Sequence, residues 1–195
     1  MRSRYLASIM IATGTLLAAI AAAGAYSPFD PDGRYDGGAA GRGPYGGSSP
    51  IARATVSYPG NYAPGTIVIS TAERRLYFVL GNGQAIRYGI GVGRVGFTWS
   101  GVKTVSAKRE WPAWTPPADM LRRRPDLPRH MKGGVENPLG ARAMYLGSTL
   151  YRIHGSNEPE TIGQAVSSGC FRLTNEDVID LYDRVRVGAK VIIGQ

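Results

Sequence analysis

Cysteine and histidine are scarce in this 195-residue chain, which has a single cysteine, Cys170, and two histidines, His130 and His154. One cysteine excludes an intramolecular disulfide. A zinc site would have to recruit carboxylates to complete its ligands, and the acidic residues show no metal-ligand spacing. We therefore expect no bound metal. The lone thiol is instead a candidate for chemistry of its own.

Long apolar runs are also missing, except for one at the N-terminus. Leu6–Ala23 is apolar, follows a short basic start, and leads into Ala23-Gly24-Ala25, which matches the A-x-A pattern of a signal-peptidase site. We predict that residues 1–25 are a signal peptide and that the chain is exported to the periplasm or cell envelope. The run is nearly long enough to span a bilayer, so an uncleaved membrane anchor stays open as the alternative.

Motifs for nucleic-acid binding are missing as well, although the chain is basic. Its formal net charge is +9, from 23 lysines and arginines against 14 acidic residues. The chain has no zinc-finger spacing, no RRM-like aromatic motif and no recognition helix, so we expect no nucleic-acid partner. For an exported protein, this charge favours contact with anionic envelope polymers or lipid surfaces.

Glycine and proline are abundant, with 27 and 13 residues, and they favour a turn-rich β protein over a helix bundle. Residues 26–62 begin with a Gly-, Pro- and Asp-rich stretch that has no apolar period, and we predict a flexible linker there. Residues 63–195 are long enough to bury one core and are predicted to form a single domain.

Short β-favouring runs follow one another through this domain. We predict strands at Thr66–Ser70, Arg75–Leu80, Gln84–Val92, Ala143–Leu146, Leu150–Ile153, Phe171–Leu173 and Lys190–Ile193, and a strand pair over Val95–Lys108. A helix is predicted after Thr174, which approximates a capping box with Asp177 and precedes apolar residues at helical spacing. The predicted fold class is mainly β, with one or two helices.

Residues 110–134 differ in character, because five prolines exclude a regular strand and allow only a short helix around Ala118–Arg123. A long insertion rich in proline and aromatic residues is more often an active-site lid or binding loop than filler. We predict a lid in which Trp111 and Trp114 offer rigid apolar faces to a substrate. His130, among basic residues of this insertion, is predicted to be a surface residue.

The candidate catalytic residues lie in Ile153–Leu173, IHGSNEPETIGQAVSSGCFRL. The thiolate is the reactive form of cysteine and a nearby imidazole promotes it, so Cys170 is the candidate nucleophile and His154 its base. Gly169 permits a tight turn that would aim the amide N–H groups around Ser168 and Gly169 at an oxyanion. The competing interpretation is an inert buried cysteine with a surface histidine.

Arg172 follows the thiol by two positions. It can fork onto a substrate carboxylate or brace the Cys170 loop from inside the protein.

His154-Gly155 followed by Ser-Ser-Gly-Cys-Phe-Arg-Leu at 167–173 resembles the motif of the YkuD-type L,D-transpeptidases, which cross-link or decorate bacterial peptidoglycan. The resemblance runs from about Thr66 to Ile193. Many relatives carry histidine at the position of Ser168, and without it His154 is the one base in the motif. The resemblance implies a two-sheet β-sandwich or partly closed barrel with the cysteine in a cleft, and substrate contacts at Arg172 and Gly155.

The activity that the resemblance implies is acyl transfer through a cysteine thioester, without a cofactor. The donor would be a peptidoglycan stem tetrapeptide, cut between its diamino acid and terminal D-alanine. The acceptor would be an amine on another stem, on a free D-amino acid or on an envelope protein. A membrane would be a partner only if the N-terminal segment stays uncleaved.

Three alternatives remain. A non-catalytic wall-binding module gives no reason for an unpaired thiol. Sortases carry their helper arginine well downstream of the cysteine, and wall-hydrolysing cysteine peptidases of papain type place cysteine before histidine.

Overall fold

The computed structural model describes residues 48–194, and this part of the chain is mainly β. The strands are β1 (Ala54–Ser57), β2 (Ile67–Ser70), β3 (Arg75–Gly81), β4 (Gln84–Gly89), β5 (Val92–Gly93), β6 (Gly101–Glu110), β7 (Arg142–Leu146), β8 (Arg152–His154), β9 (Ala165–Ser167), β10 (Phe171–Arg172) and β11 (Lys190–Gly194). The helices are α1 (Ala118–Arg123), α2 (Asn175–Arg184) and the 3-10 turn η1 (Pro159–Thr161). The predicted fold class is confirmed. The predicted signal peptide and most of the predicted linker lie outside the described residues.

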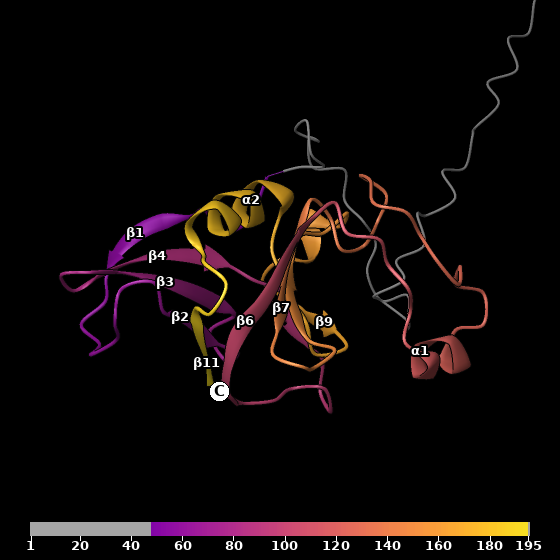
Figure 1. Cartoon of the computed structure of the whole chain (residues 1–195), viewed down its shortest axis with the longest axis horizontal. Helices are drawn as coiled ribbons and strands as arrows, with labels where there is room; N and C mark the ends of the chain where they lie inside the picture. Colours follow the sequence, from indigo (N-terminus) through magenta and orange to yellow (C-terminus); the bar gives the residue numbers. More distant parts are fainter. Residues whose placement is uncertain (1–47, 195) are drawn as a thin grey trace, which may run out of the picture.

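Strand β6 joins two groups of strands into one series. The series has nine strands in the order β1-β4-β3-β2-β11-β6-β7-β8-β10. The first residues of β6 pair with β11 and its later residues pair with β7. Near the start of its pairing with β7 the register shifts at Val105/Ala107, an irregularity that lets a strand bend. Figure 1 shows β6 as the long strand between the β1–β4–β3–β2–β11 group and β7.

Strand β10, the last of the series, returns to the first group of strands at Gly91. Its N–H and its C=O each form a 2.9 Å hydrogen bond with the backbone of Arg172, so β10 is tied to the segment that follows β4. The parallel pair of β5 and β9 also starts in this segment. The sheet therefore curls back toward its own beginning, in keeping with the partly closed arrangement that was expected.

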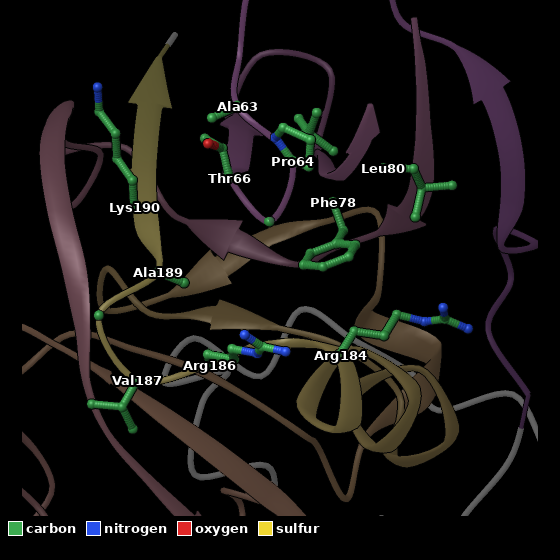
Figure 2. A pocket seen from close by; sticks show the side chains of 13 residues that line it. Ala63, Pro64, Thr66, Phe78, Leu80, Arg184, Arg186, Val187, Ala189 and Lys190 are labelled. Atoms are coloured by element: carbon green, nitrogen blue, oxygen red, sulfur yellow. The ribbon is translucent and has the colours of Figure 1, made fainter. Parts of the chain in front are cut away.

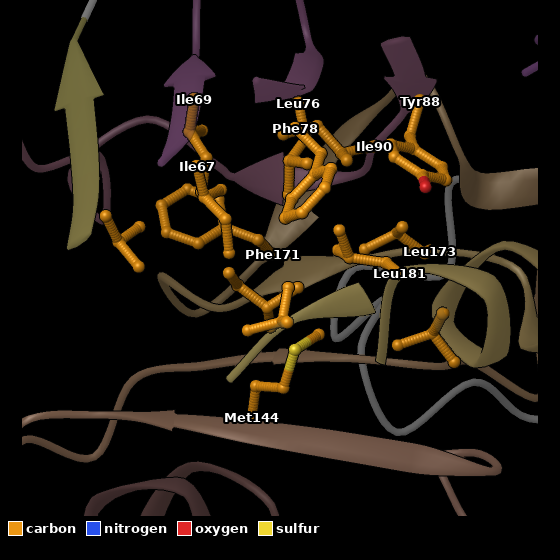
Figure 3. Packing of buried hydrophobic residues seen from close by; sticks show 14 of the residues in the cluster. Ile67, Ile69, Leu76, Phe78, Tyr88, Ile90, Met144, Phe171, Leu173 and Leu181 are labelled. Carbon is orange, nitrogen blue, oxygen red and sulfur yellow. The ribbon is translucent and has the colours of Figure 1, made fainter. Parts of the chain in front are cut away.

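The main core fills the space between the two strand groups. Ile67 and Ile69 point inward from β2, because alternate side chains of a strand lie on one face. Phe171 and Met144 meet them from β10 and β7, and Leu181 of α2 packs at one side (Figure 3). Full burial of such a side chain contributes roughly 1.5–3 kcal/mol. Phe171, the residue after Cys170, thus anchors the candidate nucleophile to the core.

Helix α2 begins where the capping pattern predicts. The Thr174 hydroxyl oxygen accepts a hydrogen bond from the Asp177 N–H at 3.2 Å, and Val178 and Leu181 are fully buried. Helix α1 lies in the insertion, far from α2 in Figure 1. In the part of the chain that the structure describes, neither helix is long and apolar enough to cross a bilayer.

The structure corrects two sequence-based boundaries. Residues 54–57 form β1 and pair with β4, so the sheet starts inside the segment 26–62 that was predicted as linker. Residues 95–100 form no strand, and the pair predicted over Val95–Lys108 is a single strand, β6. The β-favouring aromatic residues of that segment pack against the nucleophile loop instead, as described below.

Candidate active site

Strands β8 and β10 bring the predicted nucleophile and base to one face of the sheet. They are parallel, with Ile153 beside Phe171 and His154 beside Arg172. Ile153 and Phe171 belong to the core, so the alternating side chains of His154, Arg172 and Cys170 share the opposite face. Strand register therefore brings the residues of the predicted catalytic motif together.

His154 is completely buried, and its Nδ1 lies 2.6 Å from the carbonyl oxygen of Gly155. A carbonyl oxygen can only accept a hydrogen bond, so Nδ1 carries the proton and Nε2 holds the lone pair. Burial lowers the pKa of His154 to about 3, and the charges of Arg172 and Arg152 act in the same direction, while the Gly155 hydrogen bond opposes them. At neutral pH the imidazole is therefore a neutral base with a fixed tautomer.

Cys170 is half-buried, and its Sγ lies 3.8 Å from the carbonyl oxygen of Leu150. Burial of the sulfur raises the pKa of the Cys170 thiol, and the charge and hydrogen bonds of Arg152 only partly offset this rise. The resting pair is therefore a neutral thiol and a neutral imidazole. Such a thiol needs its base at the moment of attack.

Alkylation of Cys170 by iodoacetamide should show this state directly. The thiolate is the reactive form, so with a raised pKa the rate should increase about tenfold per pH unit between pH 5 and 8. The second-order rate constant can be followed by intact mass. A rate that is already at its plateau at pH 5 would contradict a neutral resting pair, because it would mean a stable thiolate–imidazolium pair.

The loop before Cys170 depends on a glycine and a serine. Gly169 has φ +104°, and a Cβ there would lie 2.5 Å from Cε1 of Tyr151. The Ser167 hydroxyl accepts the Gly169 N–H at 3.1 Å and donates to the Cys170 carbonyl at 2.7 Å. The Gly169 N–H is thus engaged within the loop. Gly169 shapes the turn, and the amide groups of Ser168 and Cys170 are the remaining candidates for an oxyanion site.

Trp99 holds this loop from outside, a role that sequence analysis missed. Its Nε1–H donates to the Gly169 carbonyl at 2.8 Å. Its ring stacks on Tyr151 with centroids 4.5 Å apart and lies 5.6 Å from the Phe171 ring. No motif marks Trp99, since it stands in a segment whose composition favours a strand.

Arg172 lies inside the protein, where a brace of the Cys170 loop would have to lie. Its side chain has no exposed surface, and its Nη1 lies 3.2 Å from Oε2 of Glu158 in the loop between β8 and β9. The role of a substrate-carboxylate fork, one of the two predicted for Arg172, does not fit this burial. Sequence analysis also missed Glu158, because the ion pair forms only when the loop folds back over the sheet.

Replacing Glu158 with glutamine should destabilise the domain by about 3 kcal/mol, because it leaves the buried Arg172 charge without its counter-ion. Chemical denaturation would measure the change in the free energy of unfolding. The matched control is Glu110→Gln, which breaks the ion pair with Arg142 at a carboxylate that is 62% exposed. That variant should lose no more than about 1 kcal/mol. Equal losses in both variants would contradict the bracing role.

The other three predicted substrate contacts, Gly155, Trp114 and Trp111, differ in their burial. Gly155 is buried, and a Cβ there would lie 2.3 Å from Oδ1 of Asn175, so this glycine serves close packing. Trp114 is only 3% exposed and packs with Met120, Leu127 and Leu139 in a small second core. Trp111 is half-buried at the start of the insertion, with φ 40°. The prediction that Trp114 offers a face to the substrate is therefore wrong, because its ring is buried in the small core of the insertion.

The insertion contacts the nucleophile loop through Phe97. The Arg123 guanidinium carbon of α1 lies 5.7 Å from the centre of the Phe97 ring. The Phe97 carbonyl oxygen would lie 3.2 Å from a Cβ at Gly169, so it touches the turn before Cys170. This contact places Arg123 of α1 next to a residue that touches the Cys170 turn, and the role of residues 110–134 as a lid stays a prediction.

A cavity of about 690 Å³ lies away from Cys170. Figure 2 shows Phe78 and Leu80 of β3 with Arg184, Arg186 and Lys190 around it, and no residue of Ile153–Leu173 lines it. Across residues 48–194, no three His, Cys, Asp or Glu side chains are arranged to hold a metal ion.

Residues 64–193 match the family model described as YkuD: L,D-transpeptidase catalytic domain. The chain belongs to this family. Among curated proteins, the probable L,D-transpeptidase ErfK/SrfK of Escherichia coli K12 is 40% identical over 136 residues, which is 65% of this chain and 43% of that protein. The putative L,D-transpeptidase YkuD of Bacillus subtilis is 47% identical over 58 residues, 30% of this chain and 35% of that protein. This chain thus spans less than half the length of these relatives.

Solved structures support the same fold. An L,D-transpeptidase from Mycobacterium smegmatis superposes with a TM-score of 0.54 at 19% identity, over 67% of this chain and 58% of that one. A Brucella melitensis chain, solved as a probable carnitine operon oxidoreductase caia, is 47% identical with a TM-score of 0.51. That match covers 75% of this chain and 96% of the Brucella chain.

Proposed function

We propose that this YkuD domain transfers the acyl group of a peptidoglycan stem peptide through a thioester on Cys170. The observation that carries the proposal is the position of His154, whose Nδ1 lies 2.6 Å from the Gly155 carbonyl oxygen, on the strand face that also carries the half-buried Cys170 thiol. A neutral imidazole whose Nε2 carries no proton is the form that a general base requires.

The reaction divides into two balanced halves. In the first, the Cys170 sulfur bonds to the carbonyl carbon of the donor while His154 Nε2 takes the thiol proton. The C–N bond then breaks, and the imidazolium returns that proton to the departing amine. In the second half, an acceptor amine gives a proton to His154 and attacks the thioester. The new amide forms, and sulfur leaves as the thiolate that regains the proton.

The loop before Cys170 would stabilise the oxyanion of each tetrahedral intermediate. The amide N–H groups of Ser168 and Cys170 are the proposed donors, since the Gly169 N–H is bonded to Ser167. Trp99 and the Arg172–Glu158 pair hold this loop from either side. A preorganised loop adds stabilisation without reorganising during the reaction.

The family assignment supports the substrate class, and the finer choices are part of the proposal. The donor is a stem tetrapeptide, cut between its diamino acid and terminal D-alanine. The acceptor is an amine of a second stem, a free D-amino acid or an envelope protein. The apolar N-terminal run and the +9 charge support an exported protein that works on an anionic envelope polymer.

Incubation of the purified protein with a disaccharide-tetrapeptide and excess D-methionine tests the proposal. Mass analysis should find the terminal D-alanine exchanged for D-methionine, and intact-mass analysis should find an acyl adduct on Cys170 before the acceptor is added. A donor that is only shortened to the tripeptide would mean hydrolysis. An unchanged donor with no adduct would refute thioester chemistry on this substrate.

A further inference from the structure

Arg152 lies beside the proposed nucleophile. It precedes Ile153 on β8 as Cys170 precedes Phe171, and Ile153 and Phe171 are register partners, so Arg152 and Cys170 are neighbours on the same face. Both reach one carbonyl oxygen, that of Leu150, which lies 3.1 Å from Arg152 Nη1 and 3.8 Å from Cys170 Sγ. The guanidinium and the sulfur are therefore adjacent.

The Arg152 guanidinium is held in place but not neutralised. Its central carbon lies 5.1 Å from the centre of the Tyr145 ring, and the side chain is half-buried. Within residues 48–194, no carboxylate forms an ion pair with Arg152, whereas the nearby Arg172 is paired with Glu158. A guanidinium has five N–H donors; one donates to the Leu150 carbonyl oxygen and the side chain also hydrogen-bonds to Cys170, which leaves further donors for a ligand.

We propose that Arg152 binds the free carboxylate of the donor's terminal residue and thereby selects stems that end one residue after the scissile bond. This rests on the proposed function. The terminal carboxylate is separated from the attacked carbonyl carbon only by the leaving nitrogen and one Cα. A cation adjacent to the sulfur is therefore within reach of it, and a guanidinium can hold a carboxylate with two parallel hydrogen bonds.

The proposal gives Arg152 the carboxylate-binding role that the sequence suggested for Arg172. Of these two arginines, only Arg152 is partly exposed. Only Arg152 can therefore contact a substrate that binds from solvent. A donor whose carboxylate is blocked or displaced by a further residue would bring an uncharged amide to this cation. It would lose a charge-assisted contact at the moment when the sulfur attacks.

Two donors that differ in one group test the proposal: a disaccharide-tetrapeptide with a free terminal carboxylate and the same compound with a terminal carboxamide. The full-length protein should prefer the carboxylate in kcat/KM on the order of 10- to 100-fold, the range of a charged hydrogen bond. Arg152→Gln should reduce this preference to about threefold or less, because it slows the carboxylate donor much more than the carboxamide donor, which loses only the effect of Arg152 on the Cys170 thiol. Arg152→Lys should keep part of the preference, and Arg186→Gln, an exposed arginine of the remote cavity, should keep all of it.

The outcomes separate this inference from the proposed function. If wild type exchanges D-alanine and Arg152→Gln keeps the full preference, the carboxylate role is wrong and the function stands. If Arg152→Gln slows both donors equally, Arg152 acts on the thiol, and the inference is again overturned. If the wild type turns over neither donor, the proposed function fails first. Thermal melting confirms folding, and Arg152→Lys carries the test if Arg152→Gln does not fold.

Discussion

Replacing Cys170 with alanine should abolish both acyl-adduct formation and D-amino acid exchange while the domain stays folded. The variant loses the only thiol of the chain. Its packing changes little, because alanine keeps the Cβ and removes only the half-buried sulfur atom. The neighbouring Phe171 continues to anchor the strand in the core. Intact mass, product mass and thermal melting measure the three quantities.

A chemical control is available because the thiol is unique. Wild-type protein alkylated to completion with iodoacetamide carries its one modification at Cys170 and should be as inactive as the alanine variant. Cys170→Ser should also be inactive, since a hydroxyl is a much weaker nucleophile without a strongly activating site. Exchange activity that survives in the pure alanine variant would rule out the thioester mechanism.

The sequence predicts the parts of this fold that depend on local chemistry. Alternating apolar residues predict β2 and β3, and the Thr174 cap predicts the start of α2. The His-Gly and Ser-Gly-Cys elements are short enough to recognise as a motif. Their convergence follows from the same alternation, since His154 and Cys170 occupy one face once β8 and β10 are parallel.

What the sequence does not predict depends on long-range packing. Arg172 has the same local context whether it faces solvent or Glu158, and only the return of the intervening loop decides its burial. Trp114 would be exposed if the insertion were extended. It is buried because Met120 and Leu127 fold back onto its ring. Trp99 favours a strand by composition, yet its indole N–H and ring face are both used by the Cys170 loop. These contacts are all non-local.

Replacing His154 with glutamine should lower the turnover of exchange by about 10²- to 10⁴-fold, the contribution of a positioned general base. Glutamine is chosen because its amide can still donate to the Gly155 carbonyl in the buried site, where alanine would leave a cavity. The amide has no basic nitrogen to take the thiol proton. The loss should be largest near neutral pH, because the raised pKa of Cys170 keeps the thiol protonated there.

The pH profile distinguishes a lost base from a damaged site. In His154→Gln, hydroxide must remove the thiol proton, so activity should climb with pH, while part of the deficit remains because the departing amine must take its proton from water. His130→Gln makes the same substitution at an exposed histidine that contacts Thr115, and it should change turnover less than about twofold. A His154→Gln deficit that stays constant from pH 6 to 10 would mean that His154 supports the site by packing. A loss confined to His130→Gln would place the base in the insertion.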